Sequence, residues 1–185
     1  MIWLGAALAA PVVEVDAGLT WARTGSEIPI VADPPNWSGL QTIVGSSPIG
    51  GLALGWRFGA ASVGLYGQAF WTPRPREYRN GHLAPLGHVR MAAWYAGGWS
   101  RFHFGPELHA GLGLGLCGMR FRTSDSFHID LDRGPGVSGE LGWTHSSGLG
   151  LSLRATGHLL RETGPLDTDW AGGELGVRLR WALVP

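Results

Sequence analysis

The chain has 185 residues, enough for one domain built on a closed sheet. Its 14 acidic and 14 basic residues cancel, so its net charge gives no reason to expect a nucleic acid as a partner. A single cysteine, Cys117, excludes an intramolecular disulfide, and the sequence has no apolar run of about 20 residues, so it predicts no spanning helix.

The amino-terminal segment is short and apolar. Ala7-Leu8-Ala9 has the form of a signal-peptidase site, although no basic residues precede it. We therefore expect residues 1–12 to be the remnant of a secretory signal or a lead-in to the first strand. Residues 13–185 are expected to form a single domain.

Apolar residues alternate with polar or small residues in eight segments, which predicts eight β-strands. In chain order the segments cover residues 13–23, 50–58, 61–71, 89–99, 107–120, 137–144, 149–160 and 174–181. In the fourth segment both faces carry apolar residues. There we assign Trp99 to the apolar face and Arg90 to the polar face.

The connections between these segments alternate in length. Those after the second, fourth and sixth segments are short, whereas the other four are longer and rich in Pro, Asn, Asp and Gly. This alternation is typical of an outer-membrane barrel with short periplasmic turns and longer outer loops. The sequence therefore predicts an all-β fold: an eight-stranded antiparallel up-and-down transmembrane β-barrel with four longer outer loops, located in the bacterial outer membrane.

Aromatic residues on the apolar faces give a second indication. In this topology they gather near the two ends of the strands, as the aromatic belts of a lipid-spanning barrel do. A soluble barrel with an apolar cavity would show the opposite facing. The predicted belt residues are Trp21, Trp56, Phe58, Trp71, Trp99, Trp143 and Trp181.

The last strand carries a recognisable motif. Its outward set ends in Leu179 and Trp181, and its other face contains Glu174 and Gly176. These four positions resemble the carboxy-terminal assembly signal of bacterial outer-membrane barrels, although here residues 182–185 follow the aromatic. The resemblance implies recognition by the outer-membrane assembly machinery.

Charged residues on the polar faces predict a network inside the barrel. Neighbouring strands bring Glu140 close to Arg154 and Arg154 close to Glu174, and closure of the barrel brings the last strand to the first. Because isolated buried charges are costly, we expect these groups to pair. The predicted members are Glu14, Asp16, Arg57, Arg90, Glu140, Arg154, Glu174, Arg178 and Arg180. Such a network would close the lumen, as in the OmpA- and OmpX-type small barrels that the chain resembles over nearly its whole length.

Three further groups of residues are candidates for functional sites. His145, Ser147 and Glu162 resemble the His/Ser/Glu set of outer-membrane lipid A deacylases, but Gly148 replaces the family's Asn and the topology separates His145 from Glu162. Asp125, His128, Asp130 and Asp132 lack a recognised calcium spacing, and we predict neither a metal site nor a cofactor. Arg74, Arg76 and Arg79 form a basic outer loop able to contact lipopolysaccharide phosphates.

The sequence favours a non-enzymatic structural or surface-interaction barrel that works through its outer loops. The expected partners are membrane lipid, lipopolysaccharide, the assembly machinery and an unknown loop ligand. A narrow ion or small-solute pore is the first alternative, and it requires a gap in the charge network. A lipid-modifying enzyme is the second.

Overall fold

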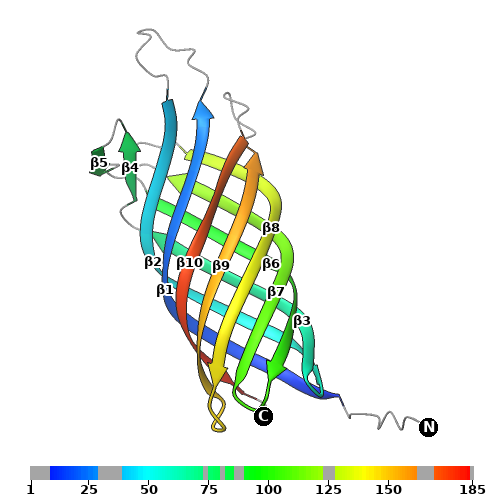
Figure 1. The fold of residues 1–185 in the computed structure, drawn as a ribbon. Helices are drawn as coiled ribbons and strands as arrows, with labels where there is room; N and C mark the ends of the chain where they lie inside the picture. Colours follow the sequence, from blue (N-terminus) through cyan, green and yellow to red (C-terminus); the bar gives the residue numbers. More distant parts are fainter. Residues whose placement is uncertain are drawn as a thin grey trace, which may run out of the picture.

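In the computed structural model, eight tilted strands form a closed antiparallel barrel (Figure 1). The structure describes residues 9–28, 39–72, 75–79, 82–85, 90–122, 128–161 and 169–183. The wall strands are β1 (Ala10–Ile28), β2 (Gly39–Phe58), β3 (Ala61–Thr72), β6 (Arg90–Phe104), β7 (Leu108–Arg122), β8 (His128–Thr144), β9 (Leu149–Arg161) and β10 (Asp169–Ala182). Among the described residues, no helix has the length and hydropathy needed to cross a membrane.

Closure of the sheet depends on β1, which pairs with β2 on one side and β10 on the other. Every other wall strand pairs with its neighbours along the chain, so the wall's backbone hydrogen bonds are made within the sheet. A short hairpin of β4 (Arg76–Arg79) and β5 (His82–Pro85) pairs with β2 near its outer end. The predicted eight-stranded barrel is confirmed.

Three short turns close the end of the barrel at which β1 begins and β10 ends (Figure 1). Each contains a glycine with positive φ: Gly59 at 61°, Gly105 at 80° and Gly148 at 84°. A side chain with a Cβ is strained in this left-handed region, which explains glycine there. We refer to this end as the periplasmic end and to the opposite one as the outer end.

The exterior of the barrel is apolar over most of its length. Leu114 is 73% exposed in the structure, and comparable aliphatic side chains face outward on the other wall strands. Exposure on this scale would be a liability in water, but it is the property that lipid requires. The exterior therefore fits a hydrocarbon environment.

Strand β6 faces the opposite way from the prediction. Trp99 is only 6% exposed and points into the barrel, whereas Arg90 lies on the exterior. The alternation was ambiguous because apolar residues occupy both faces of this strand. The strand also continues past Trp99 to Phe104, and its buried Arg101 fixes the facing. The predictions that Trp99 belongs to the aromatic belt on the lipid face and that Arg90 belongs to the lumen network are therefore wrong.

This reversal adds aromatic residues to both belts. Trp94 is exposed near the outer end, and Phe102 and Phe104 are exposed near the periplasmic end. The other six predicted belt residues face outward, with Trp21 and Trp71 on the side of the outer end and Trp56, Phe58, Trp143 and Trp181 near the periplasmic end.

Several strands extend beyond their predicted limits. β1 begins at Ala10, so residues 10–12 of the expected lead-in lie in the wall. β2 begins at Gly39 instead of residue 50, and β8 at His128 instead of residue 137. The additional residues lengthen the wall mainly toward the outer end.

Candidate functional site

The inward faces of the strands create a charged layer in the lumen. It contains four carboxylates and four arginines among the described residues, so the formal charges balance. The members come from β1, β6, β8, β9 and β10: Glu14, Asp16, Arg101, Glu140, Arg154, Glu174, Arg178 and Arg180. We call this set the lumen network.

Glu140 on β8 is the centre of the lumen network. Its Oε1 atom forms an ion pair with Arg101, whose Nε lies 3.0 Å away, and accepts from Arg180 Nη1 at 3.1 Å. The same oxygen lies 2.9 Å from His109 Nε2. Its Oε2 atom accepts from Arg154 Nε at 2.8 Å and also from Arg154 Nη2. One buried carboxylate thus binds three guanidinium groups, which offsets the cost of removing it from water.

Arg101 connects Glu140 with the first strand. Its Nη1 atom donates to Glu14 Oε2, and Arg180 Nη1 lies 3.6 Å from the same oxygen. Arg180 Nη2 also donates to Thr144 Oγ1. The guanidinium of Arg101 lies over the ring of Trp99, with its Cζ atom 4.4 Å from the ring centroid. The inward face of β6 therefore supplies both a charge and an aromatic ring to the lumen network.

A second part of the network surrounds Arg178. Its Nη1 atom donates to Tyr66 OH and lies 3.3 Å from Asp16 Oδ1, while its Nη2 atom lies 3.3 Å from Glu174 Oε1. Glu174 also accepts from Gln68 Nε2. These contacts cross the barrel interior between β10 and β3, so they fill the lumen and do not simply line its wall.

Glycines on the inward faces make room for the long side chains. A Cβ at Gly111 would lie 2.8 Å from Arg101 Cγ, and one at Gly51 would lie 2.8 Å from Asp16 Oδ2. Likewise, a Cβ at Gly142 would collide with the His109 ring. The high glycine content of the chain thus has a specific use inside the barrel.

Toward the outer end, apolar side chains replace the charges. Met91 is 0% exposed and Trp170 is 1% exposed, so both are enclosed. We call the following buried inward-facing residues, contributed by six strands, the outer plug: Ile49, Phe70, Met91, Met119, Leu160 and Trp170. The lumen is therefore occupied by two layers, one charged and one apolar.

The structure brings together seven of the nine predicted network residues. Glu140 and Arg154 are directly opposite in the β8–β9 register, and Arg180 is opposite Asp16 in the β1–β10 register. Arg154 forms its ion pair with Glu140, and Glu174 forms its ion pair with Arg178. Arg57 lies near the periplasmic mouth, where its Nε donates to Gly59 O at 3.1 Å. Arg101 lies beyond residue 99, the predicted end of the fourth strand, and periodicity alone gives no partner for His109.

The predicted assembly motif divides between the two faces of β10. Glu174 and Gly176 point inward, while Leu179 and Trp181 are exposed on the exterior. Trp181 is opposite Val15 of β1 and Leu149 of β9. The motif therefore combines lumen and lipid contacts within one strand.

The residues considered for catalysis are arranged differently. His145 and Ser147 lie in the exposed turn between β8 and β9, where His145 Nδ1 accepts from Ser147 N at 3.2 Å. Glu162 lies outside the described residues. A separate pair joins Ser62 Oγ and His103 Nε2 at 2.7 Å, but Ser62 is only 2% exposed. The His145–Ser147 contact belongs to an exposed turn, and the Ser62–His103 contact belongs to the packed lumen.

Of the other predicted outer residues, Arg76 is exposed on β4. Arg79 lies on the same strand, but its side chain is outside the described part of the structure. The remaining positions fall wholly or by their side chains outside that part: Arg74, Asp125, His128, Asp130 and Asp132.

No protein-family model and no curated protein matches the sequence. Among solved structures, Neisserial surface protein A aligns with a TM-score of 0.55 and 15% identity, over 94% of this chain and 97% of its own. The attachment invasion locus protein of Yersinia pestis aligns with a TM-score of 0.48 and 12% identity, over 93% and 99%. The Escherichia coli outer membrane protease OmpT gives 0.40 and 8%, over 94% and 97%.

The first of these similarities concerns the overall fold, and it agrees with the closed wall and the apolar exterior. The chain has the fold of the small eight-stranded β-barrels of the bacterial outer membrane.

Proposed function

We propose that the protein is a closed structural or surface-interaction barrel of the outer membrane that acts through its outer loops. The observation that carries this proposal is the binding of three arginines by Glu140 across the lumen. An ion entering from the periplasmic end would have to displace these charge-assisted contacts, which are about twice as strong as neutral hydrogen bonds.

The outer plug supports the same proposal independently. Even if the charged layer opened, Met91 and Trp170 would still obstruct the lumen with apolar surface. An eight-stranded barrel has an interior that side chains can just fill. A narrow pore is therefore the alternative, and it requires both layers to move.

The proposal includes no enzymatic activity. It is supported by the local contact of His145 with Ser147 in an exposed turn and by the burial of Ser62, whose 2% exposure leaves a substrate little access to its hydroxyl. In place of a substrate, we propose partners at the membrane: surrounding lipid, the assembly machinery that recognises β10, and a ligand of the outer loops.

The test is ion conductance of the refolded full-length chain in a planar lipid bilayer, with insertion verified by protease protection. We expect no discrete current steps from correctly inserted protein. Reproducible stepwise currents that scale with inserted protein would contradict the proposal and establish the pore. A silent barrel would direct attention to the outer loops, whose ligands can be sought with intact, membrane-inserted protein.

A further inference from the structure

Four arginines gather on the exterior of β6, β7 and β8 near the outer end. They are Arg90, Arg120, Arg122 and Arg133, and all are exposed. Arg122 and Arg90 face each other four residues beyond the register pair of Gly118 and Trp94. At a rise of about 3.4 Å per residue, the Arg90–Arg122 pair lies about 14 Å closer to the outer end than the Trp94–Gly118 pair. We call this set the outer-wall arginine cluster.

Arg90 and Arg122 form an unusual register pair. They lie directly opposite each other on the same face, and like charges in this arrangement destabilise a sheet. In the part of the chain that the structure describes, no ion pair is seen for Arg90, Arg122 or Arg133. Arg120 lies opposite Asp130 in the β7–β8 register and is not needed for this anion site. An anion between Arg90 and Arg122 would remove the repulsion.

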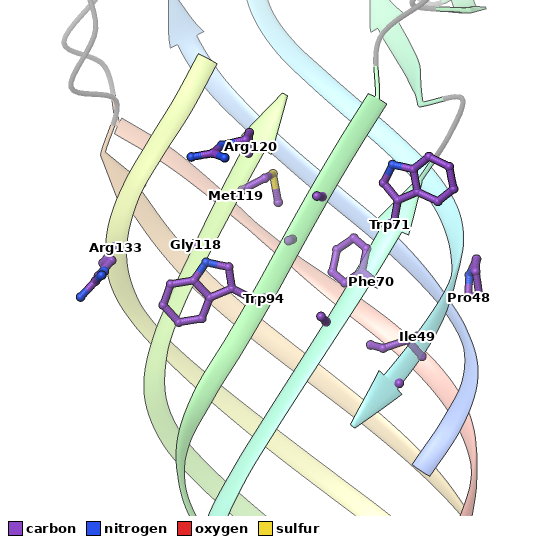
Figure 2. A pocket seen from close by; sticks show the side chains of 13 residues that line it. Pro48, Ile49, Phe70, Trp71, Trp94, Gly118, Met119, Arg120 and Arg133 are labelled. Carbon is purple, nitrogen blue, oxygen red and sulfur yellow. The ribbon is translucent and has the colours of Figure 1, made fainter. Parts of the chain in front are cut away.

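A hollow of about 1110 Å³ adjoins the cluster (Figure 2). Trp71 and Trp94 wall it, and its floor includes the small residues Ala69, Ala92 and Gly118. The Trp94 ring lies across Gly118, where a Cβ would be 2.6 Å from Trp94 Cε2. A larger side chain at residue 118 would therefore push the ring away and change the hollow.

The charged and apolar parts of this surface are in contact. The Arg90 guanidinium carbon lies 6.0 Å from the centroid of the Trp71 ring, and Arg133 lines the hollow beside Gly118. Figure 2 shows Arg120 and Arg133 at the same side of the hollow as Trp94, with Trp71 across from them. An occupant complementary to this surface has an anionic head toward the outer end and an apolar tail below it.

We propose that this face binds a phosphorylated lipid of the outer leaflet, with a headgroup phosphate between Arg90 and Arg122 and an acyl chain between Trp71 and Trp94. Arginine presents several fixed donors to phosphate, which suits this role. The tryptophans lie in the outer aromatic belt, where a chain entering the bilayer would pass. The proposal does not depend on whether the lumen conducts.

The test uses the full-length barrel refolded in detergent micelles, with native mass spectrometry to measure retention of bis-phosphorylated lipid A. The variant Arg90→Gln/Arg122→Gln removes the like-charge pair. Arg23→Gln is the matched control, since Arg23 is an exposed arginine near the outer end of β1 and has Gly173 and Val44 opposite it. Ala92→Phe fills the hollow without altering a charge. Heat-modifiable gel mobility verifies that each variant is folded.

We expect the double arginine variant to retain lipid A about tenfold more weakly, because charge-assisted contacts to phosphate are lost. Ala92→Phe should also weaken retention, whereas Arg23→Gln should behave as the wild type. Dephosphorylated lipid A should bind less well than the phosphorylated form. Equal retention by the wild type and the double variant would overturn the proposal, as would an equal loss in Arg23→Gln. Displacement of lipid A by millimolar inorganic phosphate would indicate a simple anion site and would also overturn it.

Discussion

Arg154 lies directly opposite Glu140 in the β8–β9 register, and its Nε atom donates to Glu140 Oε2 at 2.8 Å. This neighbouring-strand pair anchors contacts that reach across the barrel, because Glu140 also binds Arg101 of β6 and Arg180 of β10. Local register thus determines where a long-range network can form.

Replacing Glu140 with Gln should destabilise the barrel. The change leaves Arg101, Arg154 and Arg180 without their shared carboxylate, and breaking a buried pair typically costs about 3–5 kcal/mol. The free energy of unfolding can be measured by urea titration in lipid vesicles, with tryptophan fluorescence as the signal.

Glu107→Gln is the control for that experiment. Glu107 is exposed in a periplasmic turn, where its Oε2 atom accepts from Trp143 Nε1 at 2.9 Å. An exposed interaction of this kind contributes about 1 kcal/mol or less. Similar losses in the two variants would mean that the lumen network has no special weight in stability.

Opening both layers of the lumen should give currents whose ion selectivity follows the remaining charge. Trp170→Ala removes the largest side chain of the outer plug, and the balanced lumen network alone should keep this single variant silent. Adding Glu140→Gln leaves one more positive than negative charge in the network, which predicts anion selectivity. Adding Arg154→Gln leaves one more negative charge, which predicts cation selectivity.

The measurement is the reversal potential in a salt gradient across a planar bilayer. Because the two double variants share the Trp170→Ala opening, they differ only in the sign of the added charge. The same selectivity in both would show that the conducting path avoids the lumen network.

The close approach of two glycines should limit substitution in the wall. Gly97 and Gly115 are opposite each other in the β6–β7 register, and a Cβ at either would lie 2.6 Å from the Cα of the other. Gly115→Ala should therefore lower the free energy of unfolding by about 1–3 kcal/mol, the usual cost of overpacking. Gly139→Ala is the control, since a Cβ there meets no atom within 4 Å. A loss as large in the Gly139 variant would contradict the steric explanation.

Sequence periodicity was sufficient for the strand count and for the facing of most strands, because lipid on one side and charges on the other impose a strong alternation. It was insufficient for β6, where Met91 and Tyr95 on one face are matched by Trp94 on the other. Arg101 was the available signal, since it has the parity of Trp99 and a charged residue belongs to the lumen face. Extending the strand by two residues would have revealed the facing.

Two other features could not be derived from neighbouring strands. The contact of Arg178 with Tyr66 crosses the lumen and depends on the stagger of strands around the whole barrel. The outer plug places Phe70 and Trp170 inward near the outer end, where both faces of a strand carry apolar residues and the contrast between them is lost. Periodicity constrains a strand's two faces, whereas these contacts depend on closure.

The exposed aromatic at the end of β10 should matter more for assembly than for the stability of the folded barrel. Trp181 is 58% exposed and Trp56 is 57% exposed, and both lie outward near the periplasmic end, so loss of either ring removes a similar contact with the lipid interface. Trp181→Ala and Trp56→Ala should therefore have similar free energies of unfolding after refolding in vesicles. In cells, Trp181→Ala should give several-fold less heat-modifiable barrel in the outer membrane than Trp56→Ala, because only Trp181 belongs to the motif that resembles the assembly signal. Equal amounts of assembled protein in the two variants, at equal synthesis, would remove the role proposed for this strand end.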